Sequence, residues 1–487
     1  MKKVIIVGAG VAGLSAAIYA QRSGFHVTLI EQHSIVGGMC TSWRRKGYLF
    51  EGAIHWMTGS SPKTAMYELW KDTGALGDNV NVLLSDPFYS VEHDGQILCL
   101  YRDIKKTVES LRAISPADEA NLKQLEKEVI KLSKMQMPIY DIKGVKSENP
   151  KQMSFRDIMK MLPLMPTMNR LNKISCAEYA ARFQHPGIKR LMSFLMENYD
   201  AASFIFTLAT LHIGDGGCPE GGSLPMVHRM AQTFKDLGGT LILNTKVQKV
   251  NLVNGKAAGV TLENEVLEAD AVIVTQETIA ALDNLFDEAP NDNWLLDLRQ
   301  SVKPAVCTFI SIGVNAEIPA TPDWVLKEPI KYAGQIVNHL GFYNYSGYGG
   351  YAPSGCTTLT TGFMSDTYDF WKEAKENGRY DEEKELLAEQ IKKAICQKFP
   401  QAEGKIEVID IATPLTYERY TSAYRGSWMG ITEPGYRMKQ YPGYCESVEG
   451  LYFAGHRMTP PGGLPVALMS GRQAAQMVCR QFDVVFK

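Results

Sequence analysis

Residues 2–32 read KKVIIVGAGVAGLSAAIYAQRSGFHVTLIEQ, and this stretch decides the fold. The short β-branched run from Val4 to Val7 is typical of a buried parallel strand. Small, helix-favouring residues follow in Ala12–Ala20, Gly24 ends that helix, and Val27–Ile30 is a second apolar strand. The order of strand, helix and strand predicts an α/β fold with a βαβ unit of the Rossmann type at its start.

A glycine-rich turn joins the first strand to the helix. Gly8, Gly10 and Gly13 have the G-x-G-x-x-G spacing, which gives a tight turn and lets the backbone approach a pyrophosphate. Glu31 ends the second strand, where an acid accepts hydrogen bonds from ribose hydroxyls; a turn that only packs helix on strand would leave it unexplained. We therefore predict dinucleotide binding, with contacts from Gly8, Gly10, Val11, Ala12, Gly13, Glu31 and Gln32.

The composition excludes several classes of protein. Hydrophobic residues make up 45% and charged residues 21% of the 487 residues, as in ordinary globular proteins. The net charge of −2 and the lack of a long basic run argue against a nucleic-acid partner. The nine cysteines are dispersed without a C-x-x-C pair, which predicts reduced thiols in a cytoplasmic protein and no metal site.

The N-terminus superficially resembles a secretory signal, because Lys2 and Lys3 precede the charge-free residues Val4–Ala20. Gly8 interrupts the apolar run within the dinucleotide-binding pattern, so we expect no secretion. We also expect no membrane span, since no segment approaches the roughly 20 apolar residues that one needs.

The residues after Glu31 identify the dinucleotide by resemblance. QHSIVGGMCTSWRRKGYLFEGAIHW contains a glycine doublet, Gly37 and Gly38, and resembles the FAD-binding opening of the amine-oxidase and phytoene-desaturase superfamily. The resemblance implies FAD contacts by Gly37, Gly38 and Met39, although relatives commonly have arginine in place of Met39. Arg44 or Arg45 is the alternative partner for the phosphates.

Three later stretches extend the resemblance. Residues 218–250 match the desaturase pattern of Pro-x-Gly-Gly, a helix (Leu224–Leu237), a glycine pair and a strand (Thr240–Leu243). In the family the residue at Val247 holds the adenine through its backbone; plain strand packing is the alternative. The strand Ala269–Thr275 and the TP-x-T-x-x-R segment within 411–430 also resemble family blocks.

The stretch EGLYFAGHRMTPPGGLPVALMSGRQAA, residues 449–475, resembles the closing FAD motif of the family. A strand at Leu451–Ala454 leads through a proline-glycine loop into a helix from Pro465 to Phe482, whose positive end would stabilise anionic reduced flavin. His456 stands where the resemblance implies an acid in many relatives. The alternative interpretation is that His456 is an exposed polar residue in a loop. The implied contacts are Gly455, His456, Gly463, Leu464, Pro465 and Val466.

The resemblance implies a Rossmann-type FAD-binding domain with an inserted α+β substrate-binding domain. We predict that residues 1–85, 215–295 and 440–487 form the FAD-binding domain and that 86–214 and 296–439 form the substrate-binding domain. Methionines concentrate in 135–170, where the prolines favour a bent lid that lines an apolar cavity or meets a membrane. The tyrosine-rich loop 341–355 lines a substrate channel or forms a surface hairpin.

The implied function is an FAD-dependent oxidoreductase resembling phytoene desaturases, carotenoid isomerases and retinol saturases. It would transfer a hydride between flavin and a carbon of an apolar, polyene or isoprenoid-like substrate, in an unspecified direction. The chain shows neither a second dinucleotide fingerprint nor a C-x-x-x-x-C pair, so stable docking of NAD(P)H is not supported. The candidates for moving the accompanying proton are His55, Tyr420, Arg425 and Arg457.

Two alternatives stay open at this point. A flavin amine oxidase shares the fold and the FAD motifs, although the Pro-x-Gly-Gly and TP-x-T-x-x-R blocks favour the desaturase branch. A non-catalytic prenyl-lipid-binding escort, similar to the Rab GDP-dissociation inhibitors, would not need glycine-rich motifs at both ends. The expected partner is a hydrophobic small molecule, with peripheral contact to a membrane in a cytoplasmic protein; the oligomeric state stays open.

Overall fold

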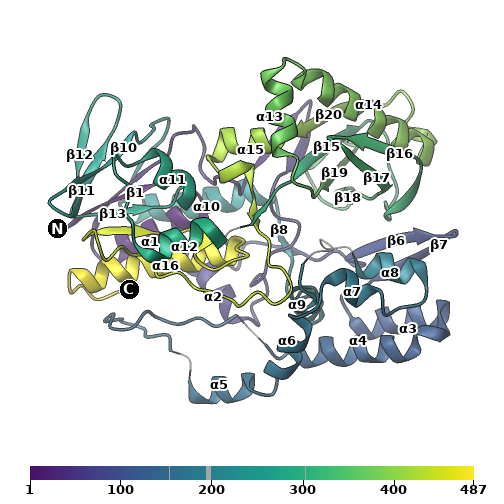
Figure 1. Cartoon of the computed structure of the whole chain (residues 1–487), viewed down its shortest axis with the longest axis horizontal. Helices are drawn as coiled ribbons and strands as arrows, with labels where there is room; N and C mark the ends of the chain where they lie inside the picture. The colour runs from purple at the N-terminus through teal and green to yellow at the C-terminus, as the bar shows by residue number, and fades with distance from the viewer. Residues whose placement is uncertain (136, 153, 194–198, 302) are drawn as a thin grey trace.

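A parallel sheet in the order β22-β13-β1-β2-β9 carries the glycine-rich turn (Figure 1). The computed structural model describes residues 1–135, 137–152, 154–193, 199–301 and 303–487, so residues 136 and 153 of the predicted lid lie outside the description. The strands are β1 (Lys3–Val7), β2 (His26–Ile30), β9 (Thr240–Ile242), β13 (Ala271–Val274) and β22 (Leu451–Phe453).

Helices cover one face of this sheet and a small antiparallel sheet with two further helices covers the other. The first layer contains α1 (Val11–Arg22), α2 (Ala65–Asp72), α10 (Ser223–Asp236) and α16 (Leu464–Gln481). The second contains β10 (Lys249–Val253), β11 (Lys256–Thr261), β12 (Val266–Glu268), α11 (Thr278–Asn284) and α12 (Asn293–Ser301). Burial of both faces explains why the strands read as continuous apolar runs.

Glycine permits the close crossings at the centre of this domain. A Cβ atom on Gly13 would lie 1.9 Å from the carbonyl oxygen of Gly8, and one on Gly471 would lie 2.2 Å from that of Ala12. The third glycine of the motif therefore sets how closely α1 packs on β1, while Gly471 sets its distance from α16. The predicted fold class is confirmed, and the predicted helices and strands of this domain differ from the observed ones by three residues or fewer at each end.

A second body is built on an antiparallel sheet in the order β18-β19-β15-β20, with two helices and a hairpin packed against it (Figure 1). Its elements are β15 (Thr308–Val314), β16 (Trp324–Tyr332), β17 (Gln335–Leu340), β18 (Tyr343–Asn344), β19 (Thr357–Phe363), α13 (Tyr368–Glu376), α14 (Tyr380–Lys398) and β20 (Ile406–Ala412). The α15 helix (Pro414–Thr421) leads from this sheet back toward the parallel sheet.

A third body is mainly helical and has a core of its own. It contains β6 (Tyr89–His93), β7 (Gln96–Leu100), α3 (Ile104–Ile114), α4 (Glu119–Leu132), α6 (Met165–Leu171), α7 (Cys176–Ala180), α8 (Pro186–Met192) and α9 (Ala201–His212). The short α5 (Phe155–Met161) extends from its lower edge in Figure 1, separated from α6 by a bend at Leu162–Leu164.

Short strand pairs connect these bodies. They are β3 (Ser42–Arg45) with β4 (Tyr48–Glu51), β5 (Val82–Leu83) with β8 (Cys218–Pro219), and β14 (Pro304–Ala305) with β21 (Met429–Gly430). Two segments cross the predicted domain boundaries: Tyr48 packs on Gly313 of β15, and Asp141 bonds to Arg472 and Gln476 of α16. The exact boundaries stay a prediction.

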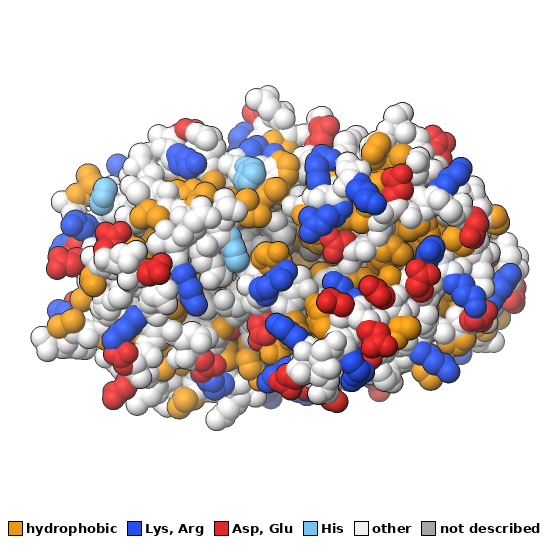
Figure 2. All heavy atoms as spheres, turned by 90° about the horizontal axis from the view of Figure 1, so that it is seen from above, with side chains coloured by type: hydrophobic (Ala, Val, Ile, Leu, Met, Phe, Trp, Pro, Cys, Tyr) orange, Lys and Arg blue, Asp and Glu red, His pale blue; other side chains and the backbone are white. Residues whose placement is uncertain are grey.

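On the face shown in Figure 2, acidic and basic side chains are interspersed, and neither type of charge forms a continuous patch. Among the described residues, no helix combines the length and the apolar character that crossing a membrane requires.

Candidate active site

One cavity of about 1450 Å³ runs between the parallel sheet and the other two bodies. Pockets for a single small ligand usually hold about 300–1,000 Å³, so this cavity has room for a large cofactor and a second ligand. The side formed by the β1 and β2 ends, residues 37–40, residues 245–248 and the start of α16 is called the cofactor side. Every predicted FAD contact except Gly13, which packs on β1, lines the cavity.

The glycine turn and Glu31 form one hydrogen-bonded unit on the cofactor side. The Glu31 carboxylate accepts hydrogen bonds from the backbone N–H groups of Ala9 (2.8 Å) and His33 (3.0 Å). The Gly37 N–H donates to the Ala9 carbonyl at 2.8 Å, which brings the glycine doublet beside the turn. The carboxylate is thus fixed at the cavity wall, with lone pairs left for ribose hydroxyls.

Backbone groups at both ends of the cofactor side fit a dinucleotide. Among the described residues, the N–H and C=O of Val247 have no hydrogen-bond partner, although the side chain is buried. Helix α16 begins after Gly463 without a side-chain cap, so the first N–H groups of the helix are open to the cavity. The first position suits the edge of an adenine base and the second suits a negatively charged flavin ring.

His456 is not an exposed loop residue. Both ring nitrogens are buried and lack a hydrogen-bond partner within the described chain. Burial and the neighbouring Arg457 lower the pKa of His456 to about 3, so the ring is neutral at pH 7. A neutral imidazole offers one donor and one acceptor to the hydroxyls of a ribityl chain, and the site therefore fits FAD.

The alternative phosphate partners lie elsewhere. Arg44 donates to the carbonyls of Gly47 and Gly350, and Arg45 pairs with Asp410 at 3.2 Å. Neither lines the cavity.

His55 lies where the cofactor side meets the other two bodies. Its ring is 6.0 Å from that of Phe309 and 5.2 Å from that of Tyr343, measured between centroids. The backbone leading to it is held by the buried Glu51, whose carboxylate accepts hydrogen bonds from the Ala53 and Ile54 N–H groups, each at 3.0 Å. Burial lowers the pKa of His55 to about 4.

The remaining wall, called the substrate side, is mainly apolar and comes from distant segments. Its apolar members are Met135, Met137, Met168, Phe206, Cys307, Phe309, Met364, Tyr417, Trp428, Met429 and Met438. Asn172, Ser203 and Thr207 add a small polar patch near α9. Of the lid methionines, Met135, Met137 and Met168 therefore line the cavity, whereas Met159, Met161 and Met165 do not.

The sequence matches the family model for flavin containing amine oxidoreductases over residues 11–479. The chain belongs to this family. Its cofactor is FAD, and the protein is an FAD-dependent oxidoreductase. Among the described residues, no group of three His, Cys, Asp or Glu side chains could hold a metal ion.

Individual relatives support the branch predicted from the sequence. The chain is 22% identical to the 1-hydroxycarotenoid 3,4-desaturase of a Flavobacterium species, over 98% of this chain and 99% of that protein. It is 21% identical to the all-trans-retinol 13,14-reductase of Danio rerio, over 88% of this chain and 77% of that protein. The resemblance to carotenoid desaturases and retinol saturases is confirmed.

A solved amine oxidase shares the fold of this flavoprotein. Cyclohexylamine oxidase from Brevibacterium oxydans superimposes with a TM-score of 0.60 at 14% identity, covering 99% of both chains. This likeness concerns the fold alone.

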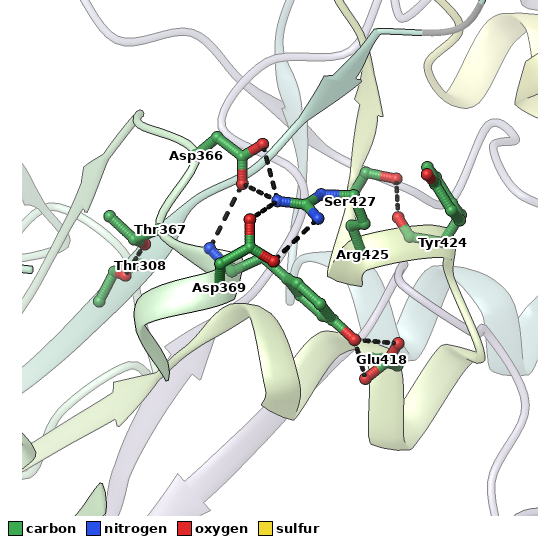
Figure 3. A network of polar contacts seen from close by, with 9 residues as sticks. Thr308, Asp366, Thr367, Asp369, Glu418, Tyr424, Arg425 and Ser427 are labelled. Atoms are coloured by element: carbon green, nitrogen blue, oxygen red, sulfur yellow. Dashed lines mark hydrogen bonds and ion pairs between the residues drawn. The ribbon is translucent and has the colours of Figure 1, made fainter. Parts of the chain in front are cut away.

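Arg425 does not reach the cavity of the flavoprotein. Its guanidinium group forms ion pairs with Asp366 and Asp369 at 3.1 and 2.8 Å and stacks on the ring of Tyr368 (Figure 3). The structure gives its predicted role in proton transfer no support, because these carboxylates hold the side chain away from the cavity lining.

Tyr420 lines the cavity at the Glu31 end. Its ring is 5.6 Å from that of His33, and its carbonyl bonds to the same His33 ring at 2.7 Å. If Glu31 binds the adenosine ribose, Tyr420 lies by the adenosine and not by the reacting ring of the flavin.

Sequence reasoning missed Glu277, a buried acid on the cavity wall that pairs with Arg457. Arg457 Nε donates to Glu277 Oε1 at 3.1 Å, and Nη2 donates to the Ser427 hydroxyl. The two side chains are 2% and 3% exposed. Arg457 is thus held in a buried ion pair at the cavity wall. The only local signal was an acid at the start of a helix after an apolar strand.

The tyrosine-rich stretch 341–355 matches the hairpin alternative, because β18 pairs antiparallel with β19 and most residues of the tip between them are exposed, although its tyrosines pack inward. Tyr345 and Tyr351 are 1% exposed and stack at 4.6 Å between ring centroids. None of the loop's tyrosines lines the cavity; they pack behind His55 instead.

Proposed function

We propose that this flavoprotein forms, saturates or isomerises a C=C bond of an apolar, polyene or isoprenoid-like substrate. The observation that carries the proposal is the apolar substrate side, which continues directly from the cofactor side within one cavity. The names of the relatives, a carotenoid desaturase and a retinol reductase, support the same substrate class.

When bound, FAD supplies two-electron chemistry by taking up or giving a hydride. The chain's own residues would bind and orient it: the glycine turn and the doublet would hold the diphosphate, Glu31 and Gln32 would bind the ribose hydroxyls, and the Val247 backbone would bind the adenine. His456 bonds the ribityl hydroxyls, and the α16 start favours negative charge on the ring. The apolar substrate side excludes water from the reacting carbon.

Among the four proton-transfer candidates, we assign contact with the substrate to His55. Both arginines are held in ion pairs, and Tyr420 contacts His33 beside the ribose site. His55 lies between the cofactor side and Phe309 of the substrate side.

An anaerobic absorbance experiment tests the proposed function. The holoenzyme is reduced chemically and mixed with retinoids, carotenoids and unsaturated lipids, while the oxidised holoenzyme is mixed with the saturated counterparts and with aliphatic amines. Return of the oxidised flavin band with an unsaturated compound identifies a saturase. Bleaching by a polyene precursor identifies a desaturase, and a changed polyene isomer without net flavin turnover identifies an isomerase.

Other outcomes overturn the proposal. Bleaching by an amine alone would make the protein an amine oxidase. A colourless protein that does not bind added FAD but retains a prenyl lipid would make it an escort.

We further infer peripheral contact with a membrane through the surface of α5 and the bend after it. Phe155, Ile158, Met159, Leu162 and Met165 are exposed there, Phe155 by 76%. Residues 134–173 contain eight basic and three acidic residues, a balance that suits an anionic lipid surface. Met135 and Met168 of the same segment line the cavity, so a lipid-dissolved substrate would enter beside them.

Flotation with vesicles that contain an anionic phospholipid tests this contact. The Phe155→Asp/Leu162→Asp variant should lose vesicle binding while it keeps bound FAD. The matched control is Val325→Asp/Ile336→Asp, which changes two apolar residues exposed by 59% and 63% on the β16–β17 hairpin and should float like the wild type. Equal flotation of all three proteins, or none by the wild type, contradicts the membrane contact.

A further inference from the structure

The surroundings of His55 hold its ring from one side only. The Tyr345 hydroxyl lies 3.3 Å from Nδ1, and the Tyr343 hydroxyl donates to the His55 carbonyl at 3.2 Å. Among the described residues, Nε2 has no hydrogen-bond partner, and it is not one of the buried unpaired atoms. Because His55 lines the cavity, this nitrogen is open to the cavity space.

The tyrosines behind the ring place a hydroxyl donor beside one of its two nitrogens. Tyr348 and Tyr343 hydroxyls are 2.8 Å apart, so when Tyr343 donates to the His55 carbonyl, Tyr348 donates to Tyr343. Burial raises the pKa of Tyr345 far above its usual value, so its hydroxyl keeps its proton and can donate to Nδ1. A neutral imidazole that accepts at Nδ1 carries its hydrogen on Nε2.

A pure hydrocarbon offers no acceptor to a hydrogen-bond donor at this position. Phe309 lies beside the ring on the cavity wall, and Cys307 and Trp428 also line the cavity. A hydrocarbon that displaces water from Nε2–H would leave this donor unpaired in a mainly apolar cavity, which is unfavourable. An oxygen atom on the ligand would pair with it instead.

We propose that the substrate carries a hydroxyl or carbonyl oxygen, that His55 Nε2–H donates a hydrogen bond to this oxygen, and that Tyr345 is the positioning residue that keeps Nε2 protonated. This inference rests on the proposed function, whose apolar substrate it refines to an oxygenated one. The oxygen lies beside the junction of the cofactor and substrate sides, so the bond that reacts is close to the oxygenated end of the molecule.

Matched ligand pairs test the inference. Binding of a polyene alcohol and of the hydrocarbon with the same chain is measured on the oxidised holoenzyme from the perturbation of the flavin and polyene absorbance bands. We expect the wild type to bind the alcohol about tenfold more tightly, as the loss of one hydrogen bond in a closed site predicts. In His55→Phe the two affinities should become equal through loss of alcohol binding alone.

Tyr345→Phe separates positioning from structural support. It should reduce the preference for the alcohol to a few-fold while hydrocarbon affinity stays unchanged, and the histidine ¹⁵N spectrum should show a mixture of His55 tautomers. A purely structural role would weaken both ligands together. His228→Phe, a change on the exposed face of α10 outside the cavity, is the matched control and should keep the full preference.

Three results would overturn the inference. One is equal affinity of the wild type for the alcohol and the hydrocarbon. A second is a changed flavin spectrum or weaker FAD binding in ligand-free His55→Phe, which would show that the donor serves the cofactor. The third is a ¹⁵N shift that places the hydrogen on Nδ1. If the alcohol and the hydrocarbon bind with equal affinity and both exchange electrons with the flavin, the proposed function stands without this refinement. If neither compound exchanges electrons with the flavin, the proposed function itself fails.

Discussion

On the cofactor side of the cavity, the lining comes from strand ends, glycine turns and one helix start; on the substrate side it comes from side chains of segments between 135 and 440. The first surface is made largely of backbone groups, whose positions the local chain determines. The second depends on which side chains meet after all three bodies have packed. The cofactor side should therefore be intolerant of small changes and the substrate side adaptable, as methionine-rich walls are.

The Glu277–Arg457 pair lies where the two sides meet, and breaking it should have the largest effect. Arg457→Met leaves a buried carboxylate without its cation, so we expect the free energy of unfolding to fall by about 3–5 kcal/mol. Urea unfolding of the holoenzyme measures this loss. The double variant Arg457→Met/Glu277→Gln should recover much of it, since no uncompensated charge remains. A single variant as stable as the wild type would show that the pair does not join the two sides.

The next test addresses the cofactor side alone. In Gly13→Ala, the new Cβ atom would lie 1.9 Å from the Gly8 carbonyl oxygen, so α1 must move away from β1. We expect a loss of about 1–3 kcal/mol in unfolding free energy and weaker FAD binding, measured by urea titration and by flavin fluorescence. Gly77→Ala is the matched control, because its Cβ would meet no atom within 4 Å. Equal behaviour of the two variants would contradict a close crossing at Gly13.

These contrasts also explain what could be predicted from the sequence. The apolar strand run, the glycine spacing and Glu31 are local signals in the sequence. The parallel sheet and the cofactor side could therefore be predicted from the sequence alone. The pairing of Arg425 with Asp366 and Asp369, and of Arg457 with Glu277, depends on segments that meet only in the folded chain. The hairpin at 341–355 was one of two alternatives, but the packing of its tyrosines behind His55 could not be predicted, because it depends on contacts between two bodies.

Lowering the pH should reduce the stability of the fold through two buried histidines, His456 on the cofactor side and His55 next to the substrate side. Burial lowers the pKa of His456 to about 3 and that of His55 to about 4, below the ordinary value of about 6.5. As the pH falls, the unfolded chain takes up these protons first, so stability is complete above about pH 6.5 and declines toward the lower values. Between pH 6 and 5, each histidine should contribute a slope of up to ~1.4 kcal/mol per pH unit.

Unfolding of the holoenzyme at several pH values measures these slopes. His456→Gln should remove one of the two contributions while leaving the other, and the difference between wild type and variant should narrow as the pH falls. Parallel stability curves for the two proteins would show that His456 is not buried in its neutral form.

The smallest effect is expected from a single change on the substrate side. Met168 lines the cavity, whereas Met161, seven residues earlier, does not. Met168→Ala should weaken binding of the polyene by roughly four- to fifteenfold, as expected when one or two buried methylene-sized groups lose contact, and should leave the FAD dissociation constant unchanged. Met161→Ala, the matched control, should alter neither. A loss of FAD affinity in Met168→Ala would mean that the two sides are not separate, because a wall residue of the substrate side would then also support the cofactor.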